Sequence, residues 1–194
     1  MSLSNPTIPT LIAPKLFDEA FLQIANDLQA EFDSWPLYAY GKCQKLVKQN
    51  GSRKEFFPAM FYGAGQNDYL SLLPDSHIGN FSFFVLEDSQ EIMEMGNPYN
   101  SLSANFGLIF WFNLEDIYPS PANWKQYSIE NVKDTLLTFL TQQRYPNVRF
   151  EFIRIWEEAD NIYKGFSHKE IEDQFLMRPY AGLRFDGKIE VTSC

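Results

Sequence analysis

The chain has 194 residues, of which 45% are hydrophobic and 16% are aromatic. This length and apolar content suit one domain with a sizeable core. The formal net charge of −9 disfavours binding to a phosphate backbone, because basic pairs such as Arg53-Lys54 form no cluster, and we therefore expect no specific nucleic-acid binding.

The first 13 residues are predicted to form an extended N-terminal arm. They are rich in Pro, Ser and Thr, show no hydrophobic period, and carry apolar side chains at Ile8, Leu11 and Ile12. Two interpretations stay open: a frayed terminus, or an arm that docks on a neighbouring molecule through these three residues. Residues 14–194 are predicted to form a single domain.

An amphipathic helix is predicted after Pro14, a residue that favours a helix start. Apolar residues then recur at the spacing of one helical stripe, on Phe17, Ala20, Phe21, Ile24 and Leu28. The helix is expected to end near Phe32.

A β-hairpin is predicted next, with strands over residues 41–48 and 56–62. The turn signal between them is Asn50-Gly51. Pro58 lies within the second strand and favours an edge position, because proline cannot donate a ladder hydrogen bond. This aromatic edge is therefore a candidate interface, with Phe56, Phe57 and Phe61 as its contact residues.

Further strands are predicted at residues 69–73, 81–86 and 101–113. The strand at 81–86 is apolar on both parities, which indicates burial on both faces. In the strand at 101–113 one face is fully apolar, on Ala104, Phe106, Leu108, Phe110 and Phe112.

A second helix is predicted from the cap residue Ser128 to about Arg144. The strand at 148–155 follows, with a bulge between Phe152 and Ile153. Residues 156–173 are ambiguous. A last strand is expected at 175–185, with Met177 on its apolar face, and Gly187 is expected to mark a turn.

The predicted core comprises Phe17, Phe21, Ile24, Phe106, Leu108, Phe110, Leu136, Leu140, Phe150 and Leu183. Strands grouped between helices favour an α+β fold over alternating βαβ winding. The prediction is a mostly antiparallel mixed sheet with two main helices packed on it.

The residues that could carry chemistry form no known catalytic or metal-binding pattern. Asp75, Ser76 and His77 are adjacent, whereas members of a triad converge from distant positions. His168 stands beside a capping-box spacing, which favours a solvated helical turn. No C-x-x-C, H-E-x-x-H, calcium loop or phosphate loop is present, so no catalytic residue, cofactor or metal is expected.

The cellular setting follows from cysteine usage and from the lack of long apolar runs. Cys43 and Cys194 are too few for a disulfide framework, which fits a reducing compartment. No apolar run reaches the ~18–20 residues of a membrane span, and the N-terminus carries no secretory pattern. We expect a cytoplasmic protein with no membrane contact.

Three segments resemble uncharacterised proteins encoded in bacterial prophages: residues 71–84, the strand at 109–114, and residues 170–185. The element order is also similar to the fold of phage tail-terminator and neck proteins. That resemblance implies a mixed sheet with helices on one face and subunits that close into a ring at the head–tail junction. It also implies contacts with other virion proteins.

The leading hypothesis is a non-enzymatic phage or prophage structural protein, of the tail-terminator or head–tail connector type, that acts by self-association and resides in the virion. The alternative is a non-viral module that recruits a partner protein through an edge strand. A small hydrolase with an unrecognised site is a third possibility, which a deep pocket around His77 would favour. Added salt is expected to strengthen self-association by screening the repulsion between acidic copies.

Overall fold

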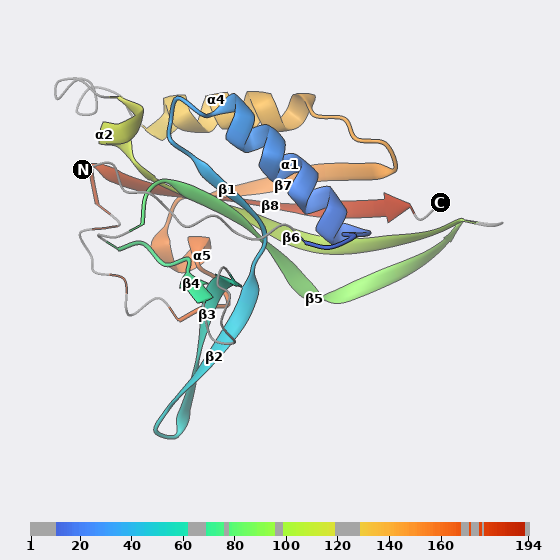
Figure 1. The fold of residues 1–194 in the computed structure, drawn as a ribbon, viewed down its shortest axis with the longest axis horizontal. Helices are drawn as coiled ribbons and strands as arrows, with labels where there is room; N and C mark the ends of the chain where they lie inside the picture. Colours follow the sequence, from blue (N-terminus) through green and yellow to red (C-terminus); the bar gives the residue numbers. More distant parts are fainter. Residues whose placement is uncertain are drawn as a thin grey trace.

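The computed structural model describes residues 11–61, 69–75, 78–95, 99–118, 129–167, 171, 175 and 177–192. Within these residues the chain forms a five-stranded mixed sheet and a three-stranded antiparallel sheet, with helices against the larger sheet (Figure 1). The α+β prediction, with a mostly antiparallel mixed sheet and two main helices, is confirmed.

The larger sheet has the strand order β1-β5-β6-β8-β7. Among the described residues of this sheet, the β1–β5 pair alone is parallel and the other pairs are antiparallel. The strands are β1 (Tyr38–Lys42), β5 (Phe81–Met95), β6 (Tyr99–Asn113), β7 (Val148–Trp156) and β8 (Tyr180–Thr192). The smaller sheet has the order β2-β3-β4, formed by β2 (Gln44–Asn50), β3 (Arg53–Phe61) and β4 (Tyr69–Ser71).

The helices α1 (Phe17–Glu31) and α4 (Ile129–Gln142) cover one face of the larger sheet (Figure 1). The predicted stripe of α1 is buried throughout and packs on the apolar parity of β6. Phe21 stacks on Phe84 of β5 with ring centroids 4.4 Å apart. All the predicted core residues contribute to this first core, and Phe150 is half-buried at its rim.

The opposite face of the larger sheet packs against the smaller sheet, the short helix α5 (Ala159–Ile162) and residues 171 and 175. The alternate residues of β5 and β6 that face this side are also apolar; they are Phe81, Phe83, Ile109 and Trp111. The Trp111 indole Nε1 donates to the Phe175 carbonyl at 2.9 Å, so the buried ring keeps a hydrogen bond. Both parities of these strands are therefore buried, as the sequence predicted for residues 81–86.

Several predicted boundaries were wrong near the C-terminal strand. β8 runs from Tyr180 to Thr192, and Gly187 lies inside it and opposite Phe106, not at a turn. A Cβ at this glycine would lie 2.4 Å from the Glu151 carbonyl, so close approach of β7 explains the glycine. Met177 precedes the strand and is 66% exposed.

The helix and bulge predictions compare well with the structure. α4 ends at Gln142, two residues before the predicted end, and α1 begins at Phe17. The register of β7 against β8 shifts between Phe152 and Arg154, which confirms the predicted bulge. The short helix α2 (Leu114–Ile117) directly follows β6 and is capped by Asn113, whose side chain accepts a hydrogen bond from Glu115 N.

Candidate functional site: open strand edges and a basic pocket

The predicted N-terminal arm is described only in part. Ile8 lies outside the described residues. Leu11 and Ile12 are 50% and 97% exposed. Two apolar side chains therefore face solvent at the point where the arm joins the domain.

The predicted aromatic edge at β3 is wrong, because β3 is the middle strand of the smaller sheet. β2 pairs along one side of it, and β4 pairs with Ala59 to Phe61 on the other. Farther along that second side, the Phe56 carbonyl accepts from Ser167 N at 2.7 Å, and Phe56 N donates to Ser167 Oγ at 3.2 Å. From Phe56 to Phe61 the backbone of this strand is thus occupied on both sides.

Of the three aromatic residues expected at that interface, only one is still exposed. Phe57 is 2% exposed and belongs to the second core, and Phe56 is half-buried. Phe61 is 36% exposed and makes an edge-to-face contact with Tyr69. Pro58 is tolerated in a middle strand because its nitrogen, which has no hydrogen to donate, faces a position where β4 has already ended. Its carbonyl still accepts from Leu72 N at 2.9 Å.

The outer edge of β2 is open among the residues that the structure describes. Phe56 and Pro58 make their backbone hydrogen bonds on the β4 side. Because adjacent residues of a strand direct their backbone groups to opposite sides, those of Phe57 and Ala59 face β2. Their partners on β2 are Leu46 and Gln44. By alternation, Lys45, Val47 and Gln49 present their backbone N–H and C=O groups outward.

A second open edge lies on β5, beyond the point where β1 ends. The last described contact on this side is Cys43 N to the Phe84 carbonyl, at 2.8 Å. The strand continues for eleven residues to Met95, and the described part of the chain places no strand beside them. Figure 1 shows this half of β5 running out with β6 beyond the end of β1.

The outward backbone groups on β5 follow from the same alternation. Phe84 faces β1, so its partner Leu108 directs its hydrogen bonds toward β8, and Ser103 and Ser101 direct theirs toward β5. Their partners on β5 are Glu91 and Met93. Gln90, Ile92 and Glu94 therefore present N–H and C=O groups outward. Ile92 is also 73% exposed.

Sequence reasoning missed this edge because it ended the strand at Leu86. The register shifts between Leu86 and Gln90, and the residues beyond have no clean alternation. The pairing of β5 with β6, a tertiary contact, keeps the segment extended. One signal was the length of the following strand, because the predicted strand at 101–113 extends well beyond what residues 81–86 could pair.

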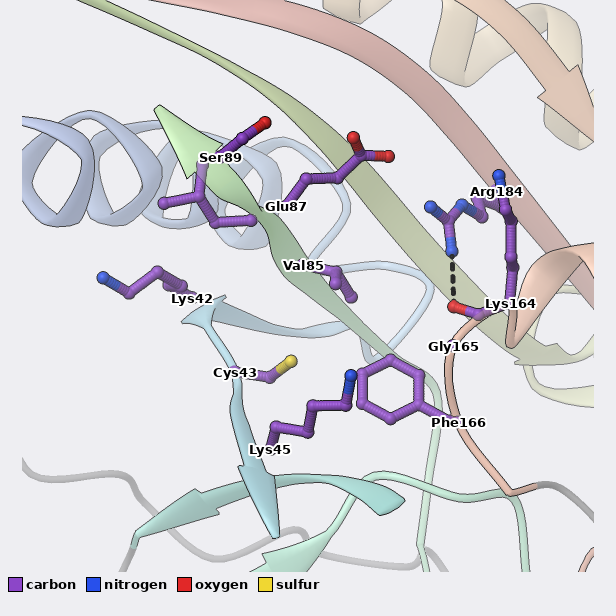
Figure 2. Close-up of a pocket in the computed structure, with 11 residues that line it drawn as sticks. Lys42, Cys43, Lys45, Val85, Glu87, Ser89, Lys164, Gly165, Phe166 and Arg184 are labelled. Atoms are coloured by element: carbon purple, nitrogen blue, oxygen red, sulfur yellow. Dashed lines mark hydrogen bonds between the residues drawn. The ribbon is translucent and has the colours of Figure 1, made fainter. Parts of the chain in front are cut away.

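A basic pocket of about 560 Å³ lies where the β1–β2 corner approaches β5 and residues 164–166 (Figure 2). Its charged lining comprises Lys42, Lys45, Lys164 and Arg184, against the single carboxylate of Glu87. Lys42 is held by Asp18 at 2.5 Å, and Lys45 lies over the Phe56 ring at 4.8 Å. Much of the pocket's charge is thus already engaged by groups of the chain.

Arg184 is the buried cation of the pocket, at 3% exposure. Its Nε donates to Asp186 Oδ1 at 2.5 Å, and Nη1 donates to the carbonyls of Ile162 and Lys164 at 3.4 and 3.3 Å. The guanidinium lies over Gly107 of β6, where a Cβ would approach it to 2.8 Å. The residue therefore ties β8 to the end of α5 (Figure 2).

The thiol of Cys43 also lines this pocket. Burial raises the pKa of this thiol to about 12. The nearby charges of Lys42, Lys45 and Arg184 lower the pKa by a smaller amount. The thiol is therefore protonated at neutral pH and is a poor nucleophile. Among the described residues that line the pocket, the side chains that could accept this proton are lysines and the Glu87 carboxylate.

The histidines singled out in the sequence, His77 and His168, lie outside the described residues, as do Ser76 and Cys194. The neighbouring Asp75 accepts a hydrogen bond from Ile78 N at 3.0 Å, which fits the turn that the sequence predicted there. No group of three or more His, Cys, Asp or Glu side chains that could hold a metal ion occurs within the described ranges.

None of the helices in the described ranges is long and apolar enough to cross a membrane. Comparison with known protein families, with curated proteins and with solved structures gave no match.

Proposed function

We propose that this chain is a non-enzymatic structural protein that acts by self-association, as phage tail-terminator and head–tail connector proteins do, with other virion proteins as its further partners. The observation that carries the proposal is the open edge of β5 beyond Phe84. An unpaired strand edge is a template for another strand, and monomeric proteins usually protect it.

Two further observations support the proposal. The helices α1 and α4 lie on one face of a mixed sheet, which is the arrangement that the resemblance to tail-terminator and neck proteins implies. The basic pocket offers a protonated thiol, and three of its cations, Lys42, Lys45 and Arg184, are already engaged by groups of the chain. The chemistry of this pocket favours a non-enzymatic role for it.

The same open edge supports one alternative, a binding module that recruits a different protein by strand addition. The two proposals differ in what the isolated chain does. A self-associating subunit forms larger species as its concentration rises, whereas a recruiting module stays monomeric until its partner is added.

Sedimentation velocity of the full chain over a range of concentration and salt tests the proposal. We expect larger species at high concentration, and we expect salt to favour them by screening the repulsion between copies of charge −9. A chain that lacks residues 1–13 should associate more weakly if Leu11 and Ile12 anchor the arm. A strict monomer under all these conditions would contradict self-association and favour the recruiting module.

A second, independent check is the genomic neighbourhood of the gene. Genes for portal, capsid or tail proteins beside it are expected under the structural proposal. A neighbourhood without any of them would favour the non-viral module.

A further inference from the structure

We propose that the open edge of β2 in one copy adds to the open edge of β5 in the next copy, antiparallel and head to tail. The partner is thus a second copy of this chain. This inference rests on the self-association proposed above and names the two surfaces that make the contact.

The backbone geometry of the two edges allows this addition. Lys45, Val47 and Gln49 present their N–H and C=O groups outward on β2, and Gln90, Ile92 and Glu94 do so on β5. Each edge therefore offers three outward-facing residues at a spacing of two, which is what an antiparallel ladder requires.

One antiparallel register matches the side chains of both edges. It sets the apolar pair Val47 and Ile92 opposite each other, and these two side chains are 53% and 73% exposed. In the same register Leu46 faces Met93, Lys48 faces Glu91, and Gln49 faces Gln90. In this register, the residues whose backbone N–H and C=O groups face outward on β2 lie opposite those whose groups face outward on β5. The hydrogen-bonding pattern and the side-chain chemistry therefore favour the same alignment.

The charges of the two edges are opposite, although the whole chain is acidic. The β2–β3 hairpin carries Lys45, Lys48, Arg53 and Lys54 against Glu55. The far half of β5 carries Glu87, Asp88, Glu91 and Glu94 and no basic residue. Pairing of β5 with β5 would oppose acid to acid, and pairing of β2 with β2 would oppose base to base. Between these two edges, charge therefore favours the mixed contact.

A contact between two different edges has a consequence for the assembly. Each copy has one edge of each kind, so every added copy leaves one edge of each kind open. Such a heterologous contact closes into a ring when the rotation between copies allows it, and otherwise continues as a filament. In either case the smaller sheet of one copy becomes continuous with the larger sheet of the next.

The test is a charge swap at the described pair Lys48 and Glu91, read by sedimentation of the full chain. The single variants Lys48→Glu and Glu91→Lys should each weaken association about tenfold, because an attractive cross-strand pair becomes repulsive. The double variant Lys48→Glu/Glu91→Lys restores opposite charges in every contact and should return association to within about threefold of the original chain.

The net charge separates this contact from general repulsion. Glu91→Lys changes the formal charge from −9 to −7, so screening or repulsion alone would make that variant associate more strongly. The proposed contact requires it to associate more weakly. Arg178→Glu in the loop before β8 and Glu31→Lys at the end of α1 are matched controls with equal charge changes away from both edges, and should alter association less than twofold.

A backbone variant tests the edge itself. Val47→Pro removes one outward N–H from an edge strand, where proline is tolerated, and should abolish association while the melting temperature stays close to that of the original chain. If this variant fails to fold, the charge swap at two exposed side chains still decides. Its melting temperatures are compared as well, because Glu91 also contacts Lys188 at 3.8 Å and Lys48 lies over the Phe57 ring at 4.7 Å.

The outcomes distinguish the inference from the proposed function. If the original chain associates but the single variants associate equally well, or the double variant is no better than they are, this contact is wrong and self-association stands. If the original chain is monomeric at every concentration and salt, the proposed function is overturned and this contact with it.

Discussion

The two faces of the larger sheet are built by different means. On the first face, α1 and α4 contact the strands through periodic apolar stripes, and the core includes stacked pairs such as Phe21 and Phe84. On the second face, a small sheet, a one-turn helix and two loop residues cover the strands. This second core encloses a charged side chain, Arg184, and the hydroxyl of Tyr163. Burial raises the pKa of that hydroxyl well above its ordinary value.

The difference shows how each face is stabilised. Continuous apolar stripes bury area on the first face without any specific partner. The irregular segments on the second face have fewer apolar side chains, and Arg184 joins them by donating to two carbonyls and to Asp186. Substitutions on the two faces should therefore fail for different reasons: loss of apolar contact on the first, and unpaired polar groups on the second.

The largest effect is expected from Arg184→Ala. Its loss leaves the half-buried Asp186 carboxylate and two carbonyls without their donor, and we expect a loss of about 3–5 kcal/mol in the free energy of unfolding. A loss near 3 kcal/mol is favoured, because Asp186 keeps one donor in this variant: it also accepts a hydrogen bond from Trp156 Nε1 at 2.8 Å. Denaturant unfolding measures this. A loss below about 1 kcal/mol would show that Arg184 does not hold the second face together.

Leu108→Ala tests the first face at its centre. Leu108 is fully buried in the middle of β6, so its truncation should cost about 2–5 kcal/mol by loss of apolar contact and by the cavity left behind. Leu108→Met keeps most of the volume and should cost less than about 1.5 kcal/mol. Equal losses for the two variants would contradict a cavity as the cause.

Gly107→Ala should have a smaller effect, on the second face. The added methyl would lie 2.8 Å from atoms of the Arg184 guanidinium, which must shift, and we expect a loss of about 1–3 kcal/mol. The loss should nearly vanish when the same substitution is made in an Arg184→Ala background, because the clashing group is gone. Additive losses in the double variant would show that the two positions do not interact.

The sequence predicted the first face well because its signals are periodic. The stripe from Phe17 to Leu28 and the parity from Ala104 to Phe112 are each a direct consequence of helix or strand geometry. Such patterns fix which side of an element is buried before any partner is known. The two helices and the buried parity of β6 followed from them.

The second face and the open edges could not be predicted in this way. Pro58 favoured an edge, but whether a strand is at an edge depends on which other strands pair beside it, and short β4 supplied that pairing. Gly187 indicated a turn, but the Glu151 carbonyl of β7 approaches it inside a strand. The extension of β5 past Leu86 is likewise a result of pairing with β6. Long-range contacts decided each of these cases.

The smallest effect is expected at the rim of the first face, where Lys133 of α4 contacts Glu130 and Glu157 at 2.5 and 2.6 Å. These hydrogen bonds, with Glu130 first, raise the pKa of Lys133. The folded state therefore holds this proton more tightly than the unfolded state does. The stabilisation is fully present below the ordinary lysine pKa and is lost as the pH rises through the higher folded pKa.

Lys133→Gln should cost less than about 1 kcal/mol near neutral pH, because all three side chains are partly exposed. The loss should shrink in high salt, whereas the cost of Leu108→Ala should not. A large, salt-independent loss for Lys133→Gln would mean that the aliphatic part of the Lys133 side chain packs on the first core. The losses for Lys133→Gln and Leu108→Ala would then share one cause, the loss of apolar contact.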